Sequence, residues 1–234
     1  MSVRFGVVGT GWWADEIHAA GIVAHPSTEL AAVWGRDPAK ARAFAERRGA
    51  DAVAGFDELL GQVDALAFAV PPDVQAELAE RAARAGKHLL LEKPLATSLD
   101  AADRVVAALD VGGGAALVFF TGRFAPPTAA WFRDVVAAAA WEGGQATWLA
   151  ALDVPESPFR DSPWRWDKGA LWDVGPHALA ALLPALGPVE PAAAYAVALA
   201  ELVRLIETGE REHECALRLG REVVRVLAEA EAQL

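Results

Sequence analysis

The chain has 234 residues and a formal net charge of −11 at pH 7, which argues against nucleic acid and anionic membranes as partners, because both need basic patches. Cys215 is the single cysteine, so an internal disulfide is excluded and a reducing compartment fits. The length suits one or two domains. We find no targeting segment and no uninterrupted apolar run of about 20 residues, and we therefore expect a cytoplasmic protein without a membrane span.

Near the N-terminus, an apolar run over residues 4–8 leads through a glycine-rich turn into a helical pattern. Gly9 permits a tight turn, Gly11 has no Cβ to keep a pyrophosphate away, and Ala14 is small enough for helix and strand to pack. The N–H groups of the first helical turn then face the anion. This pattern favours a dinucleotide site over a structural turn, and the site would include Gly9, Thr10, Gly11, Trp12 and Trp13.

Beyond this turn, apolar runs alternate with helical segments of about 10–15 residues, the pattern of a doubly wound parallel sheet in an α/β fold. We predict further strands at residues 30–34, within 51–60, and at 65–70, 88–91 and 115–120, and helices at 12–25, 38–48, 73–85 and 98–109. His18, inside the first helix, is interpreted as an ordinary helix-face histidine. Ligands of such sheets bind at the carboxyl ends of strands, where Pro71, Lys93 and Arg123 lie.

The end of the second predicted strand bears on the choice of dinucleotide. NAD sites usually have Asp or Glu here, which binds the ribose 2′-hydroxyl. In this chain Gly35 takes that place and Arg36 follows. A guanidinium can bind a 2′-phosphate and stack on adenine, so we predict NADP, with NAD as the second choice. The alternative is that Arg36 is a solvated surface residue and that Asp37 reaches the ribose.

The second half of the chain has a different composition. We predict a strand at residues 145–152, a loop rich in Pro, Asp and Trp at 154–168, a helix that begins at 173 and reaches about 186, and two final helices at 192–207 and 212–232. Six of the nine tryptophans lie from Trp131 onward. Flat apolar rings suit the C–H faces of a sugar or cyclitol, although core or interface packing is the preferred interpretation for Trp131, Trp141 and Trp148. Trp166 is the one that we retain as a candidate substrate contact.

Lys93 is the first candidate for chemistry. The charged pair Glu92-Lys93 follows a buried strand directly, and such a placement is costly unless it has a function. Pro94 fixes the local turn, and its peptide bond is a candidate for the cis form. A lysine beside a nicotinamide could hydrogen-bond a substrate oxygen and stabilise developing alkoxide charge. The alternative is a structural ion pair at the strand end.

Asp173 and His177 form the second candidate. They are four residues apart at a predicted helix start, so both side chains can project from one face. Histidine can give or take a proton near neutral pH, and the aspartate could orient the imidazole or bind the substrate. Gly175 between them lets a ligand or backbone come close. The alternative is a capping aspartate with a buried histidine.

Together these motifs resemble the glucose–fructose oxidoreductase, inositol dehydrogenase and rhizopine-catabolism (Gfo/Idh/MocA) family. The resemblance covers the N-terminal part almost throughout and is carried by Gly9-Thr10-Gly11, residues 64–72 and 85–88, Glu92-Lys93-Pro94, Arg123-Phe124 and Asp173-Val174-Gly175-Pro176-His177. It implies a Rossmann domain at residues 1–122. It also implies an α+β substrate and oligomerisation domain at 123–234, with an open, mainly antiparallel sheet and a last helix that packs back on the Rossmann domain.

The resemblance also implies a reaction, namely reversible hydride transfer between a nicotinamide and a carbon bearing a secondary hydroxyl, on a sugar, sugar derivative or cyclitol. His177 would be the general acid/base, Lys93 would polarise the substrate oxygen and contact the nicotinamide, and Asp173 would position substrate and His177. A homodimer or homotetramer is compatible with the family, and no metal site is predicted. The cofactor contacts beyond the glycine turn would be Gly35, Arg36, Val70, Pro71, Gln75, Glu92, Lys93 and Arg123.

Two departures from the family pattern leave alternatives open. Gln75 stands where relatives often have His, so contacts near the cofactor can differ. The second domain is also short, since residues 191–195 pass straight to the final helices. Either its sheet is reduced, or a block of chain is absent from this sequence. The alternatives to a sugar or cyclitol dehydrogenase are a dinucleotide-binding sensor or scaffold without turnover, and a relative that acts on a dihydrodiol or imine.

Overall fold

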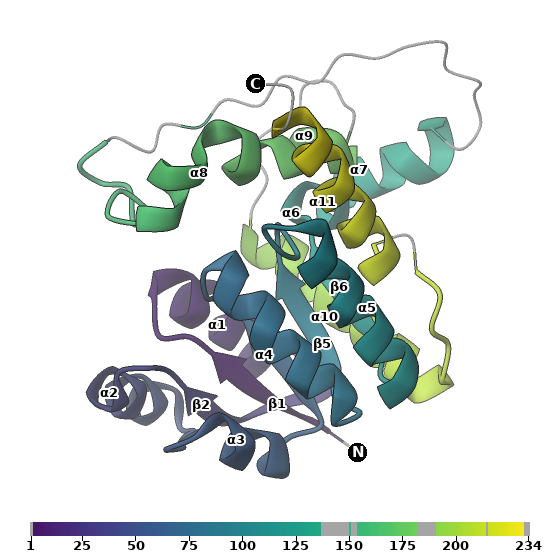
Figure 1. Cartoon of the computed structure of the whole chain (residues 1–234). Coiled ribbons are helices and arrows are strands. Elements are labelled where there is room, and N and C mark those ends of the chain that lie inside the picture. Colours follow the sequence, from purple (N-terminus) through teal and green to yellow (C-terminus); the bar gives the residue numbers. More distant parts are fainter. Residues whose placement is uncertain (1, 137–149, 151–153, 182–190, 214, 232–234) are drawn as a thin grey trace.

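The described part of the computed structural model comprises residues 2–136, 150, 154–181, 191–213 and 215–231 (Figure 1). Its centre is a six-stranded sheet in the order β3-β2-β1-β4-β5-β6, and every neighbouring pair is parallel. This confirms the predicted doubly wound sheet. The strands are β1 (Val3–Val8), β2 (Thr28–Trp34), β3 (Asp51–Ala52), β4 (Ala65–Phe68), β5 (His88–Glu92) and β6 (Ala116–Phe119).

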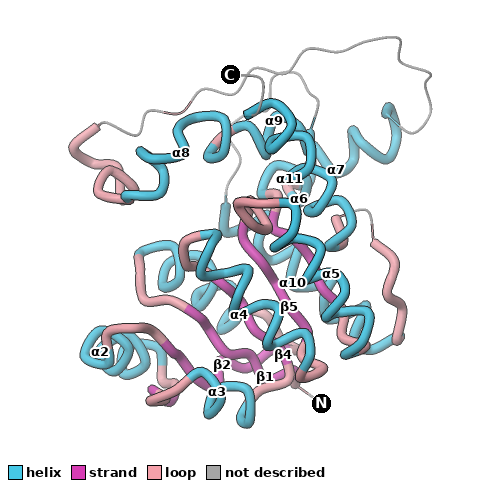
Figure 2. Tube along the Cα trace, viewed as in Figure 1, coloured by secondary structure: helices cyan, strands magenta, loops and turns pink. Residues whose placement is uncertain are grey.

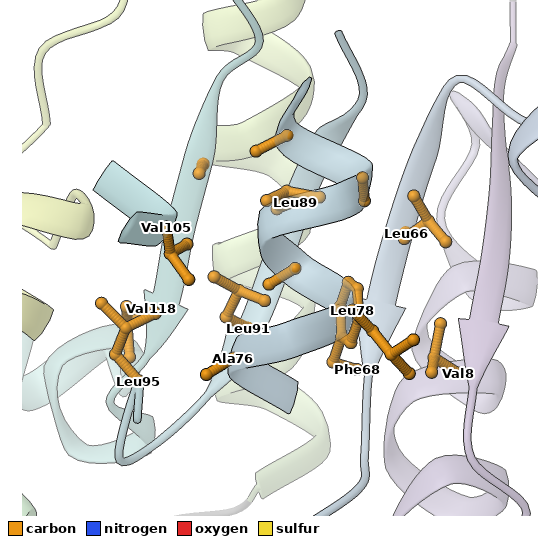
Figure 3. Close-up of a cluster of buried hydrophobic side chains, with 14 of the residues drawn as sticks. Val8, Leu66, Phe68, Ala76, Leu78, Leu89, Leu91, Leu95, Val105 and Val118 are labelled. Carbon is orange, nitrogen blue, oxygen red and sulfur yellow. The ribbon is translucent and has the colours of Figure 1, made fainter. Parts of the chain in front are cut away.

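Helices cover both faces of this sheet because alternate residues of the buried strands point to opposite sides. Leu89 and Leu91 of β5 belong to one core, whereas Leu90 belongs to the other. Figure 3 shows part of the first core, in which Leu78 of α4 lies beside Phe68 of β4. This face carries α3 (Phe56–Gln62), α4 (Pro72–Arg84), α5 (Leu99–Gly112) and α11 (Leu217–Glu231), and the other carries η1 (Ala14–Ala19), α1 (Ala20–Ala24), α2 (Pro38–Arg48) and α10 (Pro191–Thr208).

The helix boundaries of the first half follow local chemistry. The Asp37 carboxylate caps α2 by accepting hydrogen bonds from the N–H groups of Ala39 and Lys40, and Pro38 occupies the first helical position. The Ser98 hydroxyl caps α5 in the same way. Gly49 and Gly113 end these helices in the left-handed conformation. Figure 2 shows α4 and α5 in front of the magenta strands.

The second half of the chain, as far as it is described, contains no strand. After β6 come α6 (Thr121–Phe124), α7 (Pro126–Trp131), η2 (Phe132–Val136), α8 (Pro163–Asp173) and α9 (Gly175–Ala181). α8 and α9 lie at the end of the molecule opposite the N-terminus (Figure 1). The predicted strand at 145–152, Trp141 and Trp148 lie outside the described residues, except for Ala150. α10 packs against η1 and α1, and α11 packs against α5.

Three predictions for this half were wrong. Residues 163–168 are helical and not loop, because Pro163 at the first position favours a helix start. Asp173 ends a helix and does not open one, since α9 begins only at Gly175. α11 begins at Leu217, five residues later than expected from the predicted start at 212. The apolar periodicity indicated helices here, but it did not mark the breaks between them.

Candidate active site

A pocket of about 410 Å³ lies where the carboxyl ends of the strands face α8 and α9. Ten of the predicted site residues line it, although they come from four separate parts of the sequence. Trp164 and Arg165, which were not predicted, line it as well. The ten are Gly11, Trp12, Trp13, Val70, Pro71, Gln75, Glu92, Lys93, Asp173 and His177.

The glycine-rich turn has the shape that a bound pyrophosphate needs. Gly9 has φ +120°, and a Cβ there would lie 2.4 Å from the carbonyl oxygen of Ala69. At Gly11, by contrast, a Cβ would meet no atom within 4 Å, so the backbone is open toward the pocket. The turn is followed at once by helix, as anion binding at a helix start requires. These residues therefore fit a dinucleotide.

Gly35 and Arg36 lie after β2, outside the residues that line the pocket. A Cβ on Gly35 would lie 2.6 Å from Cγ2 of Thr10, so glycine is required there for packing on the turn. Arg36 is exposed, and among the described residues it forms no ion pair. The Asp37 carboxylate is engaged in capping α2. This geometry favours Arg36 over Asp37 as the residue available to a ribose substituent.

Gln75 fixes the end of β5. Its Oε1 accepts a hydrogen bond from the N–H of Glu92 at 2.8 Å, and its Nε2 donates to the carbonyl of Glu92 at 2.8 Å. The same Nε2 lies 3.1 and 3.2 Å from the carbonyls of Pro94 and Leu95. The Lys93-Pro94 bond is cis. Gln75, fully buried, thus holds the turn that presents Lys93.

Lys93 and Asp173 meet although 80 residues separate them in sequence. Nζ of Lys93 lies 3.0 Å from Oδ1 of Asp173 and 2.5 Å from its carbonyl oxygen. The guanidinium of Arg165 binds the same carboxylate oxygen. All three side chains are largely buried. One carboxylate therefore neutralises two buried cations at the wall of the pocket.

Burial, together with the charge of this cluster, determines the protonation state of His177. Burial lowers the pKa of His177 well below its usual value of 6.5, and the positive charges of Lys93 and Arg165 lower it further. Burial is also the main cause that lowers the pKa of Lys93, which Asp173 and Glu92 partly offset. At neutral pH the imidazole is therefore uncharged and can accept a proton.

We expect this buried histidine to make the protein less stable in mild acid. Below pH 6.5 an unfolded chain binds a proton at His177 that the folded protein excludes, so the free energy of unfolding should rise with pH between the folded-state pKa and 6.5. Urea unfolding on both sides of this window should show a smaller rise in His177→Gln than in the parent. Burial also lowers the pKa of His88. Because His88 is present in both proteins, its contribution to the pH dependence cancels in the comparison. An identical rise in both proteins would contradict the assignment.

Arg165 is a site residue that the sequence did not reveal. It stands in a segment predicted as loop, and it reaches Asp173 because α8 is broken at Gly169, which has φ +65°. Its guanidinium lies over the rings of Phe159 and Trp164, 4.5 and 4.7 Å from their centres. The only indication in the sequence was the position of Arg165 between Trp164 and Trp166, two aromatic residues on which a guanidinium can stack.

Four other residues have surroundings that differ from those predicted from the sequence. Trp166 is 54% exposed and outside the pocket, with its indole N–H donating to the carbonyl of Arg160, and Trp164 lines the wall instead. Arg123 is buried over the ring of Phe132, also outside the pocket lining. A Cβ on Gly175 would lie 3.3 Å from the side chain of Leu227 of α11 and 3.9 Å from the backbone carbonyl oxygen of Ala170. His18 is a fully buried, hydrogen-bonded residue and not an ordinary helix-face histidine.

Within the residues described, no helix is long and apolar enough to cross a membrane. Over the same residues, no group of three or more His, Cys, Asp and Glu side chains is arranged to hold a metal ion.

Comparison with known proteins identifies relatives of this chain. The family model of oxidoreductases with an NAD-binding Rossmann fold, GFO_IDH_MocA, matches residues 3–120. A dTDP-3,4-didehydro-2,6-dideoxy-alpha-D-glucose 3-reductase of Streptomyces violaceoruber is 38% identical over 189 residues, which are 78% of this chain and 54% of that protein. Inositol 2-dehydrogenase of Rhizobium meliloti strain 1021 is 38% identical over 134 residues, 54% of this chain and 38% of that protein.

A structural relative shares the fold. KijD10, a 3-ketoreductase of Actinomadura kijaniata solved with NADP and TDP-benzene, superimposes with a TM-score of 0.77 over 97% of this chain and 96% of that chain, at 20% identity. The chain spans about half the length of the curated relatives it matches first, 54% and 57%.

Proposed function

The chain belongs to the Gfo/Idh/MocA family of oxidoreductases with an NAD-binding Rossmann fold, and from this premise we propose that it transfers a hydride between a nicotinamide and a secondary alcohol or ketone. The substrate class that we propose is a sugar, a sugar derivative or a cyclitol. One observation carries the proposal: Lys93, at the end of β5, is held against Asp173 of α8 at the wall of a pocket that His177 also lines.

The proposed roles follow from the state of each group. The nicotinamide, when bound along the glycine turn, supplies or accepts the hydride. The neutral imidazole of His177 takes the hydroxyl proton during oxidation and returns it during reduction. The ammonium of Lys93 donates to the substrate oxygen and stabilises the negative charge that develops there. Asp173 fixes Lys93, and Arg165 fixes Asp173 by binding the same carboxylate oxygen.

We propose NADP as the preferred cofactor. The exposed Arg36 follows β2 where a carboxylate would select NAD, and the neighbouring Asp37 caps α2. Relatives were solved with either cofactor, KijD10 with NADP and GenD2 from gentamicin A biosynthesis with NAD, so the preference rests on Arg36. A cytoplasmic location, assembly as a homodimer or homotetramer, and a division into domains at residues 1–122 and 123–234 belong to the same proposal. Light scattering on the purified protein tests the assembly.

Replacing Arg36 should separate the two cofactors. Arg36→Ala removes a charge-assisted hydrogen bond to the 2′-phosphate, so we expect the Kd for NADP to rise about tenfold or more while the Kd for NAD changes little. Arg42→Ala, at an exposed position of α2, is the matched control for lost positive charge. Titration of protein fluorescence with each cofactor measures both constants. Equal losses for NADP and NAD would show that Arg36 does not read the phosphate.

The activity itself is tested by turnover on a substrate panel. The panel contains inositols, free keto-sugars, a dihydrodiol and an imine. It also contains dTDP-linked keto-deoxysugars, because one relative is a reductase of such a compound. Reduced nicotinamide is followed by its absorbance with each cofactor in both directions. Turnover that His177→Gln abolishes supports the proposal. Tight cofactor binding without turnover on the whole panel would favour a sensor or scaffold, and activity confined to a dihydrodiol or imine would change the substrate class.

A further inference from the structure

A chain of hydrogen-bonded side chains leads from the pocket into the core of the protein. Nδ1 of His18 lies 2.8 Å from the hydroxyl of Tyr195, and its Nε2 lies 3.2 Å from Oε1 of Glu92. His18 and Tyr195 are fully buried, whereas Glu92 lines the pocket. Tyr195 comes from α10, so the chain of bonds joins the C-terminal part of the sequence to the end of β5.

The direction of these hydrogen bonds follows from the chemistry of the groups. A carboxylate can only accept, so Nε2 of His18 carries the proton and Nδ1 is the acceptor for the Tyr195 hydroxyl. Burial, together with the nearby charge of Glu92, raises the pKa of Tyr195 well above its ordinary value, which keeps the hydroxyl protonated and able to donate. The imidazole is thereby fixed as one tautomer and in one orientation.

Glu92 receives a second donor on the same oxygen. The indole N–H of Trp13 lies 2.6 Å from Oε1, and the other oxygen accepts the N–H of Lys93 at 3.3 Å. The carboxylate thus links the side chain of Trp13, which lines the pocket, to the backbone of Lys93. Oε1 is therefore shared by His18 and Trp13, which both donate a hydrogen bond to it.

The first helical segment leaves room for this arrangement. A Cβ on Gly21 would lie 2.1 Å from Cδ1 of Tyr195, so the ring fits only because residue 21 is glycine. The ring also packs edge-on against His18 and Phe119. The hydroxyl therefore reaches His18 from a site shaped for a tyrosine.

We propose that His18 and Tyr195 are positioning residues of the redox site, which act through Glu92 to fix Trp13 and the backbone of Lys93. The catalytic part of this inference rests on the proposed function, whereas the placement of Trp13 does not. A purely structural role in docking α10 predicts lost stability alone. A positioning role predicts a local change at Trp13 and a slower chemical step.

The test combines a spectroscopic readout with kinetics. Tyr195→Phe keeps the packed ring and removes only the hydroxyl, and Leu199→Ala, one turn further on at a fully buried position of α10, is the matched packing control. The indole N–H resonance of Trp13, assigned with Trp13→Phe in tryptophan-labelled protein, reports its hydrogen bond to Glu92. We expect Tyr195→Phe to move this resonance upfield and to lower kcat about tenfold with little change in KM for the cofactor. Leu199→Ala should lower Tm and leave the Trp13 resonance and kcat unchanged.

A second pair of variants covers the histidine. Gln at position 18 can keep a donor where Nε2 stands, so His18→Gln should retain more of the Trp13 signal and of kcat than His18→Leu. The inference is overturned if Tyr195→Phe loses stability as Leu199→Ala does but keeps the parent resonance. Should the parent show no turnover on any substrate, the proposed function fails, and the Trp13 resonance still decides whether His18 and Tyr195 position Glu92.

Discussion

Lys93→Ala is expected to lower kcat/KM by about 10²-fold or more, the scale of a lost donor to a developing oxyanion. The expectation follows from the position of Nζ, which is buried at the wall of the pocket with Asp173 as its ionic partner. In the variant, Asp173 keeps Arg165 as a partner, so the fold should survive. Affinity for the cofactor should change little, because the glycine turn is untouched.

The measurement is steady-state kinetics with the best substrate of the panel, together with cofactor titration and a thermal melt. Lys168→Ala is a suitable control, since Lys168 lies on α8 outside the pocket lining and pairs with Glu231. It removes an equal charge from the same region, and it should leave kcat/KM near the parent value. Parent-like activity in Lys93→Ala would remove Lys93 from the mechanism.

Asp173→Asn is expected to destabilise the protein by about 3–5 kcal/mol, the usual cost when one partner of a buried ion pair is removed. Lys93 and Arg165 would then be two buried cations without the carboxylate that they share. The pKa of Lys93 should fall further, because Asp173 is one of the charges that raise it. Activity should fall as well, since both the position and the charge of the lysine change.

Urea unfolding at neutral pH measures this effect, and Asp57→Asn gives the comparison. Asp57 pairs with Arg81 at 2.6 Å, but its side chain is 83% exposed, so removing its charge should cost no more than about 1 kcal/mol. Similar losses in the two variants would mean that the Asp173 cluster contributes no more than a solvated pair. An Asp173→Asn protein of parent stability would contradict the buried-charge argument directly.

The fold of the first half was predictable because its signals are local. Runs such as Leu89–Leu91 are short, apolar and bounded by charged or glycine residues, and such runs mark buried parallel strands. The lysine at the end of β5 could be singled out for the same reason, since a charge there is out of pattern. Asp173 and His177 could be selected as a pair, although their spacing spans a break between two helices and not one helix start.

The rest of the site depends on contacts between distant segments, which spacing does not encode. Arg165 meets Asp173 across a kink in α8 at Gly169, and a single glycine in a sequence does not reveal that it has a positive φ. The environment of His18 depends on Tyr195, 177 residues away, so helical periodicity could not distinguish it from a surface histidine. Trp164 lines the pocket, whereas Trp166, two residues later, is exposed outside it. This difference could be predicted only from the path of α8.

Lys93, the proposed donor to the substrate oxygen, directly follows β5, a strand whose three leucines are fully buried. Leu89, Leu90 and Leu91 have no exposed surface, and β4 and β6 flank them. The position of the ammonium is therefore fixed by a strand in the core of the protein. The opposite wall of the pocket is formed by α8 and α9, which lie outside the sheet. Specificity can therefore diversify through other residues of that outer wall, such as Trp164, as long as Asp173 and His177, which α8 and α9 also carry, are kept.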